Sequence, residues 1–72
     1  MYTLGMKVKI NKEGHAKYGK DFMNPVDTIG VVIERPSFLP EWRKLDPQWT
    51  WVIWEGGVEN SYQAGTLEIV EG

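Results

Sequence analysis

Hydrophobic and polar residues alternate early in the chain, and this alternation predicts a strand over residues 5–10 (GMKVKI). Its apolar residues fall on one face, and Lys7 and Lys9 fall on the other, which is typical of a half-buried strand. Residues 28–34 (TIGVVIE) are mostly β-branched and apolar, so they predict a central strand. A glycine inside a strand indicates a bulge or a bend, and we expect one at Gly30.

The segment 49–54 (WTWVIW) has high strand propensity and is apolar on both faces. Trp49 and Trp51 fall on one face, and Trp54 falls on the other. We therefore expect a strand that is central or covered by a loop. Most of it should be core, including at least one of Trp49 and Trp51. The glycine pair 56–57 predicts a tight hairpin turn, because such turns need positive φ.

The rest of the chain divides into two more strands and two long loops. VENSY (58–62) predicts the strand that returns from the hairpin, and TLEIV (66–70) predicts a last strand after a short QAG turn. Residues 11–27 show neither the helical nor the strand period, and they predict a long loop with one helical turn at 15–18. Residues 35–48 contain three prolines, which prevent a regular ladder, so they predict a second long loop.

These elements fit one small domain that spans residues 1–72. A chain of this length buries a small core, and without cysteine it has no disulfide to support that core. Its four Trp, three Tyr and two Phe residues supply large side chains for packing. Five short strands that must hide their edges predict an all-β fold, a small five-stranded SH3-like barrel with two long loops.

The sequence offers few residues for catalysis or metal binding. His15 is the only histidine, and no cysteine accompanies it to complete the three or four ligands that zinc needs. Ser37 and Ser61 have no histidine nearby in the sequence. Glu55 and Glu59 flank the glycine pair, and we interpret them as an exposed acidic tip rather than a general acid–base pair. We therefore predict a non-enzymatic protein with no cofactor and no metal site.

Charge is unevenly distributed along the chain. The formal net charge is −2, from eight basic and ten acidic residues, and this balance argues against a dedicated DNA-binding protein. The alternative is a KOW-like nucleic-acid-binding module that uses lysines and stacking aromatics. Its lysines would be those of the N-terminal segment, Lys7, Lys9, Lys12, Lys17 and Lys20.

Localisation signals are absent from the sequence. No segment combines a basic start with an apolar stretch, and no apolar run approaches the roughly 18 residues that span a membrane. The absence of cysteine is compatible with a reducing compartment. We expect a cytoplasmic protein that does not engage membranes.

The last three strands carry a recognisable set of residues: a V-x-W segment, an acidic-Gly turn, N-x-Y, a glycine and an L-x-hydrophobic strand. They are Val52, Trp54, Glu55, Gly56, Asn60, Tyr62, Gly65, Leu67 and Ile69, joined by Gly5, Val8 and residues 29–32 near the start. The set resembles the small SH3-like barrels that include KOW-type modules, and it is most similar to the MIB/HERC2 domain of ubiquitin ligases. That family usually has Arg where Gln63 stands here, and its first loop carries a D-W-x-W-type segment that this chain lacks. The family's peptide-binding surface is therefore not carried over.

The resemblance and the aromatic content together favour an interaction module that binds a protein or peptide partner. Similar minimal barrels also occur as stand-alone proteins of bacteria and phages, so action of a phage protein on a host factor is one expectation. We expect a monomer or a weak homodimer, the latter formed through Trp42 or Trp49. The predicted partner-binding residues are the loop and hairpin residues Tyr18, Phe22, Phe38, Trp42, Trp54, Glu55 and Glu59.

Overall fold

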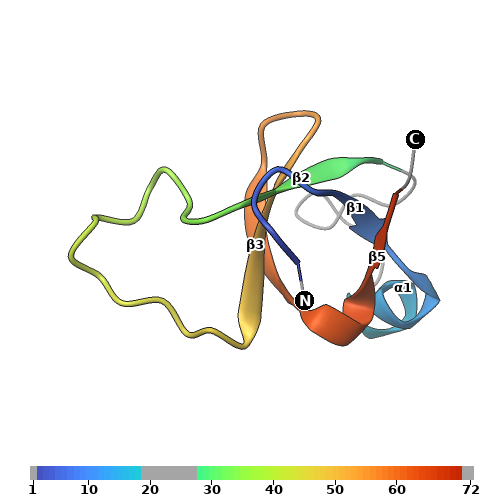
Figure 1. Ribbon diagram of the computed structural model, residues 1–72. Helices are drawn as coiled ribbons and strands as arrows, with labels where there is room; N and C mark the ends of the chain where they lie inside the picture. The colour runs from blue at the N-terminus through green and yellow to red at the C-terminus, as the bar shows by residue number, and fades with distance from the viewer. Residues whose placement is uncertain (1, 19–27, 71–72) are drawn as a thin grey trace.

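Five short antiparallel strands form one sheet in the computed structural model, which describes residues 2–18 and 28–70 (Figure 1). The strand order is β4-β3-β2-β1-β5, so the first strand lies beside the last. Among the described strands no ladder joins β4 to β5, and the sheet is not closed into a barrel. The elements in chain order are β1 (Lys7–Ile10), α1 (Lys12–Tyr18), β2 (Gly30–Ile33), β3 (Trp49–Trp54), β4 (Glu59–Gln63), the 3₁₀ helix η1 (Ala64–Thr66) and β5 (Leu67–Ile69).

The predicted five strands are confirmed as a mostly-strand domain, and the segments between them are more regular than predicted. The predicted helical turn in the first loop is a two-turn helix, α1, that begins directly after β1. Asn11 starts it, because its side-chain oxygen accepts the backbone N–H of Gly14 at 2.9 Å. The predicted QAG turn is the 3₁₀ helix η1. In the described part of the chain, no helix has the length and apolar character to cross a membrane.

The β3–β4 hairpin has a three-residue loop. Gly57 N–H donates to the Trp54 carbonyl at 2.8 Å, and Trp54 N–H donates to the Val58 carbonyl at 2.8 Å. Gly57 has a φ of 92°, whereas the φ of Gly56 is not in the positive range that favours glycine. This pattern is a β-turn followed by a left-handed residue, which is a common hairpin with a G1 bulge. The glycine pair therefore makes the predicted turn, and only its second member needs the conformational freedom of glycine.

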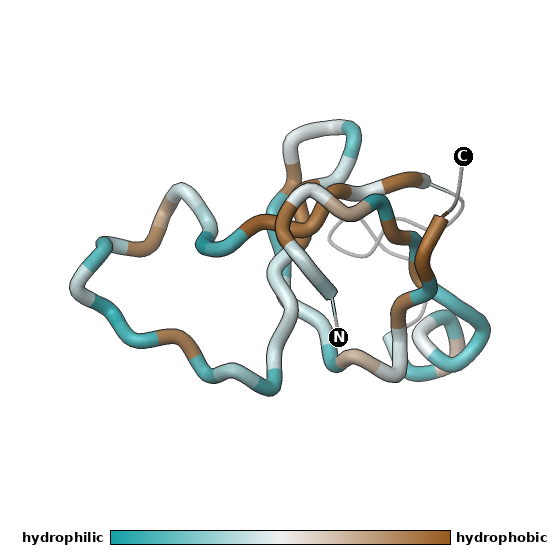
Figure 2. Tube along the Cα trace, viewed as in Figure 1, coloured by the Kyte–Doolittle hydropathy of each residue, from teal (hydrophilic) through white to brown (hydrophobic). Residues whose placement is uncertain are grey.

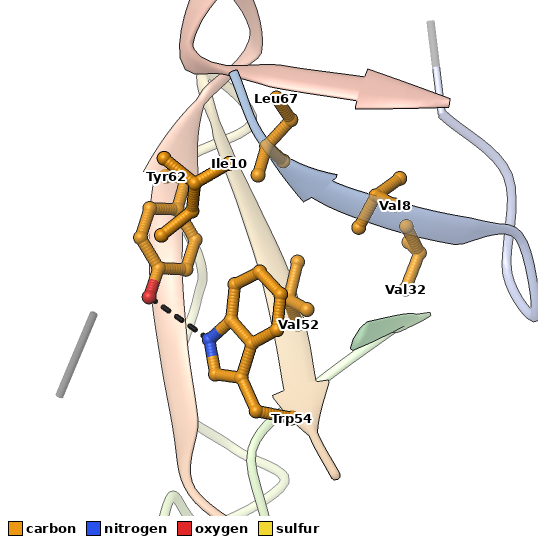
Figure 3. Packing of buried hydrophobic residues seen from close by; sticks show 7 residues of the cluster. All are labelled: Val8, Ile10, Val32, Val52, Trp54, Tyr62 and Leu67. Atoms are coloured by element: carbon orange, nitrogen blue, oxygen red, sulfur yellow. Dashed lines mark hydrogen bonds between the residues drawn. The ribbon is translucent and has the colours of Figure 1, made fainter. Parts of the chain in front are cut away.

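The core lies on one side of the sheet and draws from all five strands (Figure 3). Trp54 and Tyr62 are its large members, and their rings meet edge to face with centroids 5.6 Å apart. The indole Nε1–H of Trp54 donates to the Tyr62 hydroxyl at 2.9 Å, so the buried donor is satisfied. The buried hydrophobic residues are Val8, Ile10, Val32, Val52, Trp54, Tyr62 and Leu67.

The face of β3 that enters the core is the one that carries Trp54, and the expectation that Trp49 or Trp51 is core is wrong. Trp54 is 2 % exposed, whereas Trp51 is half-buried on the opposite face and Trp49 is 38 % exposed. The physical reason lies in the neighbouring strand, where Gly30 is paired with Trp54. A Cβ on Gly30 would lie 2.6 Å from Cε3 of the indole. Gly30 therefore leaves the space that the indole fills.

We predict that Gly30→Ala lowers the free energy of unfolding by roughly 1–3 kcal/mol, because the added methyl overpacks the site. It would also lie 2.4 Å from Cγ1 of Val52. Gly56→Ala is the matched control, since nothing lies within 4 Å of its Cβ position. Urea unfolding of both variants checks this, and an equal loss of stability in both would contradict the assigned role of Gly30.

Candidate functional site

An apolar pocket opens where the end of β2 meets the start of β3, beneath the N-terminal segment. Its cavity volume is about 530 Å³. This lies within the range of roughly 300–1,000 Å³ that is usual for ligand-binding clefts. Glu34 is the one charged residue of its lining. The lining residues are Tyr2, Leu4, Val32, Ile33, Glu34, Pro47, Gln48, Trp49, Thr50 and Ala64.

Tyr2 forms one wall of the pocket and is held in place by backbone carbonyls. Its hydroxyl lies 2.8 Å from the Leu67 carbonyl and 2.9 Å from the Ala64 carbonyl. Burial raises the pKa of the Tyr2 phenol, so the group is a neutral donor at physiological pH. Tyr2 thus ties the N-terminal segment to η1 and β5.

Trp49 also lines the pocket, at the first position of β3. A turn precedes it, in which Trp49 N–H donates to the Asp46 carbonyl at 3.1 Å. The Asp46 carboxylate accepts hydrogen bonds from the backbone N–H and the side chain of Gln48, at 3.0 and 2.9 Å. These hydrogen bonds lower the pKa of Asp46, so the turn keeps its charged form down to acidic pH. Trp49 is therefore held at the rim of the pocket with part of its indole facing solvent.

The loop of residues 34–48 projects from the sheet (Figure 1), and we call it the projecting loop. Its two ends contribute Glu34, Pro47 and Gln48 to the lining of the pocket. Its first part is anchored to the outer face of β3 and β4. Pro36 is fully buried, and Phe38 packs edge to face on Trp51 with ring centroids 5.8 Å apart. The Glu59 carboxylate accepts the Ser37 backbone N–H at 2.9 Å and also the Ser37 hydroxyl.

The tip of the projecting loop is hydrophilic apart from a few positions (Figure 2), yet it carries the most exposed large hydrophobic side chain in the described part of the chain. Trp42 is 81 % exposed, and Phe38 nearer the base is 63 % exposed. The tip keeps a defined backbone, because Arg43 N–H donates to the Pro40 carbonyl at 3.1 Å and the Arg35 side chain donates to the same carbonyl at 2.9 Å. The projecting loop therefore carries exposed aromatic side chains at its tip and near its base.

The structure separates the aromatic residues that the sequence grouped as partner-binding. Phe38 and Trp42 are exposed on the projecting loop. Tyr18 is half-buried, with its ring 5.4 Å from that of Tyr62, so it supports the core. Trp54 is removed from the predicted surface, because it is buried against Tyr62. Phe22 lies outside the described residues.

The predicted acidic tip is also revised. Glu55 is exposed in the hairpin turn, as expected. Glu59 is half-buried, and its carboxylate binds Ser37 of the projecting loop rather than standing beside Glu55. Register explains the difference, because Glu59 pairs with Ile53 inside the ladder while Glu55 lies within the turn. Glu59 is therefore an anchor for the loop.

Sequence reasoning missed the pocket itself. Tyr2 and Leu4 precede the first strand and belong to no pattern, and Tyr2 reaches η1 only through a tertiary hydrogen bond to the Ala64 carbonyl. The proline-bracketed loop before Trp49 was the available signal, since it places that indole where a strand emerges from a turn. Searched over residues 2–18 and 28–70, the structure contains no group of three or more His, Cys, Asp or Glu residues that could hold a metal ion.

The fold is shared with a solved structure. The chain is similar to the NMR structure of Bacillus subtilis protein YorP, with a TM-score of 0.63 and 24 % sequence identity. The match covers 99 % of this chain and 71 % of that one, and it indicates a common fold. No protein-family model matches the chain, and no curated protein matches it either. The resemblance to MIB/HERC2 domains therefore rests on the quoted residues alone.

We predict that Glu59→Gln loosens the projecting loop, because a carboxylate that accepts two hydrogen bonds is replaced by a neutral amide. The expected loss of stability is about 0.5–1.5 kcal/mol. Amide hydrogen exchange at Ser37 should become faster, and the indole signals of Trp51 should shift in NMR spectra. Glu55→Gln is the control, since Glu55 lies exposed in the hairpin turn. Unchanged exchange at Ser37 in Glu59→Gln would show that the anchor is not energetically significant.

Proposed function

We propose that this domain is a non-enzymatic interaction module that binds a segment of a protein or peptide partner. The segment would lie in the pocket between Tyr2 and Trp49 and continue along the projecting loop. The observation that carries the proposal is the adjacency of an apolar pocket of about 530 Å³ and an anchored loop with two exposed aromatic side chains. Aromatic side chains in such positions are frequent energetic centres of protein interfaces.

The anchoring of the loop supports binding because it reduces the entropy lost when a partner docks. Buried Pro36, the Ser37 hydrogen bonds to Glu59 and the Phe38 contact with Trp51 hold the base before any partner arrives. Trp49 is held in the same way by the turn at Asp46. A peptide in extended conformation suits this site, because its backbone can meet the polar groups of the rim while alternate side chains enter the pocket.

We further propose that the sheet is an open form of the SH3-like barrel. The support is the strand order, in which β1 pairs with both β2 and β5, so the two halves of the sheet face a common core. Four of the MIB/HERC2-like residues fit this proposal as structural residues, since Val52, Trp54, Tyr62 and Leu67 are buried. They support the fold of that family and not its binding surface.

Nucleic-acid binding in the KOW manner is the second candidate function. It is favoured by the exposure of Lys7, Lys9, Lys12 and Lys17 on β1 and α1. It is weakened by the partners of two of them, because Lys9 lies 3.8 Å from the Glu68 carboxylate and the Lys17 ammonium donates to the Gln63 side chain. Lys20 lies outside the described residues.

We predict that Trp49→Ala reduces the affinity for selected peptides at least about tenfold, because the indole is a wall of the pocket. The probe is a displayed library of random peptides selected on the wild-type protein, with affinities measured by fluorescence anisotropy. Ile69→Ala is the control, because Ile69 is 50 % exposed on β5 and does not line the pocket. Thermal unfolding should first establish that both variants are folded. Selected peptides that bind Trp49→Ala and wild type equally would contradict the proposal.

We expect that any affinity of the protein for single-stranded oligonucleotides such as oligo(dT) and oligo(U) does not fall steeply as the salt concentration rises. Contacts to phosphates release counterions, so genuine nucleic-acid binding loses affinity steeply as salt increases. A fluorescence titration at low and at physiological salt measures this. Tight binding at low salt that weakens steeply, and that is lost in Lys7→Ala/Lys12→Ala, would favour the second candidate instead.

A further inference from the structure

The exposure of Trp42 is not explained by the fold. Its indole is 81 % exposed at the tip of the projecting loop, and tryptophan is among the residues that most often carry binding energy at protein interfaces. The loop backbone around it is fixed by the hydrogen bonds to the Pro40 carbonyl, so the indole is held away from its own domain. Glu41 precedes it, and two basic residues, Arg43 and Lys44, follow it directly, so the exposed stretch 41–44 has one net positive charge. The tip is therefore an aromatic group beside a small excess of positive charge.

The pocket on the same chain is also apolar and aromatic, but the charge beside it is negative. Its walls are largely apolar with two aromatic members, and the only charge in its lining is the carboxylate of Glu34. Among the described residues, the structure contains one ion pair, between Lys9 and Glu68. Glu34 therefore makes no ion pair with Arg43 or Lys44 of its own chain. The apolar pocket can thus receive the Trp42 indole, and the charge of Glu34 is opposite to the charge of Arg43 and Lys44.

We propose that the Trp42 tip of one copy enters the pocket of a second copy, and that the second copy returns the same contact. The dimer is isologous, because each chain supplies one tip and one pocket across a twofold axis. Trp42 packs between Tyr2 and Trp49 of the other copy, and Arg43 and Lys44 lie near the Glu34 carboxylate of that copy. The proposal depends on the pocket but not on a peptide ligand, so it is tested without one.

The size of the contact predicts a weak and reversible dimer. Two indoles bury about 300–500 Å² in total, at roughly 150–250 Å² each. A stable interface needs about 1,000 Å² or more, so the flanking residues must contribute and dissociation stays easy. Occupation of the pocket by the tip of a second copy then competes with any peptide. Self-association would keep the binding site covered at high concentration and open it on dilution.

Sedimentation equilibrium over about a hundredfold range of concentration tests the dimer, with the full chain and no added ligand. The wild type should shift from monomer to dimer, and Trp42→Ala and Trp49→Ala should each weaken association at least about 30-fold. Ile69→Ala removes another exposed hydrophobic side chain and should leave association unchanged. A wild type that stays monomeric, or equal weakening by Ile69→Ala, overturns the proposal.

A charge exchange tests the orientation of the two copies. Glu34→Arg places positive charge at both the pocket and the tip, and Arg43→Glu/Lys44→Glu places negative charge at both, so each variant alone should associate at least about tenfold more weakly. Mixed together, they form a heterodimer in which each pocket again meets a tip of opposite charge. Association of the mixture should return to near the wild-type strength. Failure of the mixture to recover overturns the proposed pairing.

Failure of this proposal and failure of the proposed function are distinguishable. A monomeric wild type that binds selected peptides through Trp49 removes the dimer and leaves the interaction module. A dimer that depends on Trp42 and Trp49, with no peptide selected, supports the second copy as the occupant of the pocket. Where both hold, added peptide should shift the sedimentation profile toward monomer.

Discussion

The hydrogen bond between the Trp54 indole and the Tyr62 hydroxyl is the constraint on which the rest of this small domain depends. An indole placed in the interior must find both space and an acceptor for its N–H. Gly30 gives the space from β2, and Tyr62 gives the acceptor from β4. Strands β2, β3 and β4 are thereby fixed relative to one another by one side chain. A domain of 72 residues has few other large groups to perform this task.

The inward direction of Trp54 decides what the other face of β3 can do. Since side chains alternate along a strand, Trp51 must point outward when Trp54 points inward. Trp51 then becomes the base on which Phe38 and the projecting loop rest, and Glu59 on the neighbouring strand faces the same side to bind Ser37. Trp49 ends at the rim of the pocket for the same reason. The core and the base of the projecting loop therefore lie on two sides of one strand.

Part of this arrangement was predictable from sequence. The five strands and the hairpin turn follow from local patterns, and each is found within a residue or two of its predicted place. The choice of face in 49–54 did not follow, because both faces are apolar and only the partner strand, with Gly30 opposite Trp54, decides between them. The pocket was unpredictable for a related reason. Tyr2 reaches η1 and β5 by hydrogen bonds that connect residues more than 60 positions apart.

The anchoring of the projecting loop at its two ends has a consequence for how the domain can change. Pro36, Ser37 and Phe38 fix its start, and the turn from Asp46 to Trp49 fixes its end, while residues 41–44 at the tip are exposed. Substitutions at these tip positions alter what the surface contacts without disturbing the packing of the sheet. The surface that the tip presents can thus vary while the scaffold stays the same. For protein engineering, the same stretch is the natural place to graft new recognition sequences.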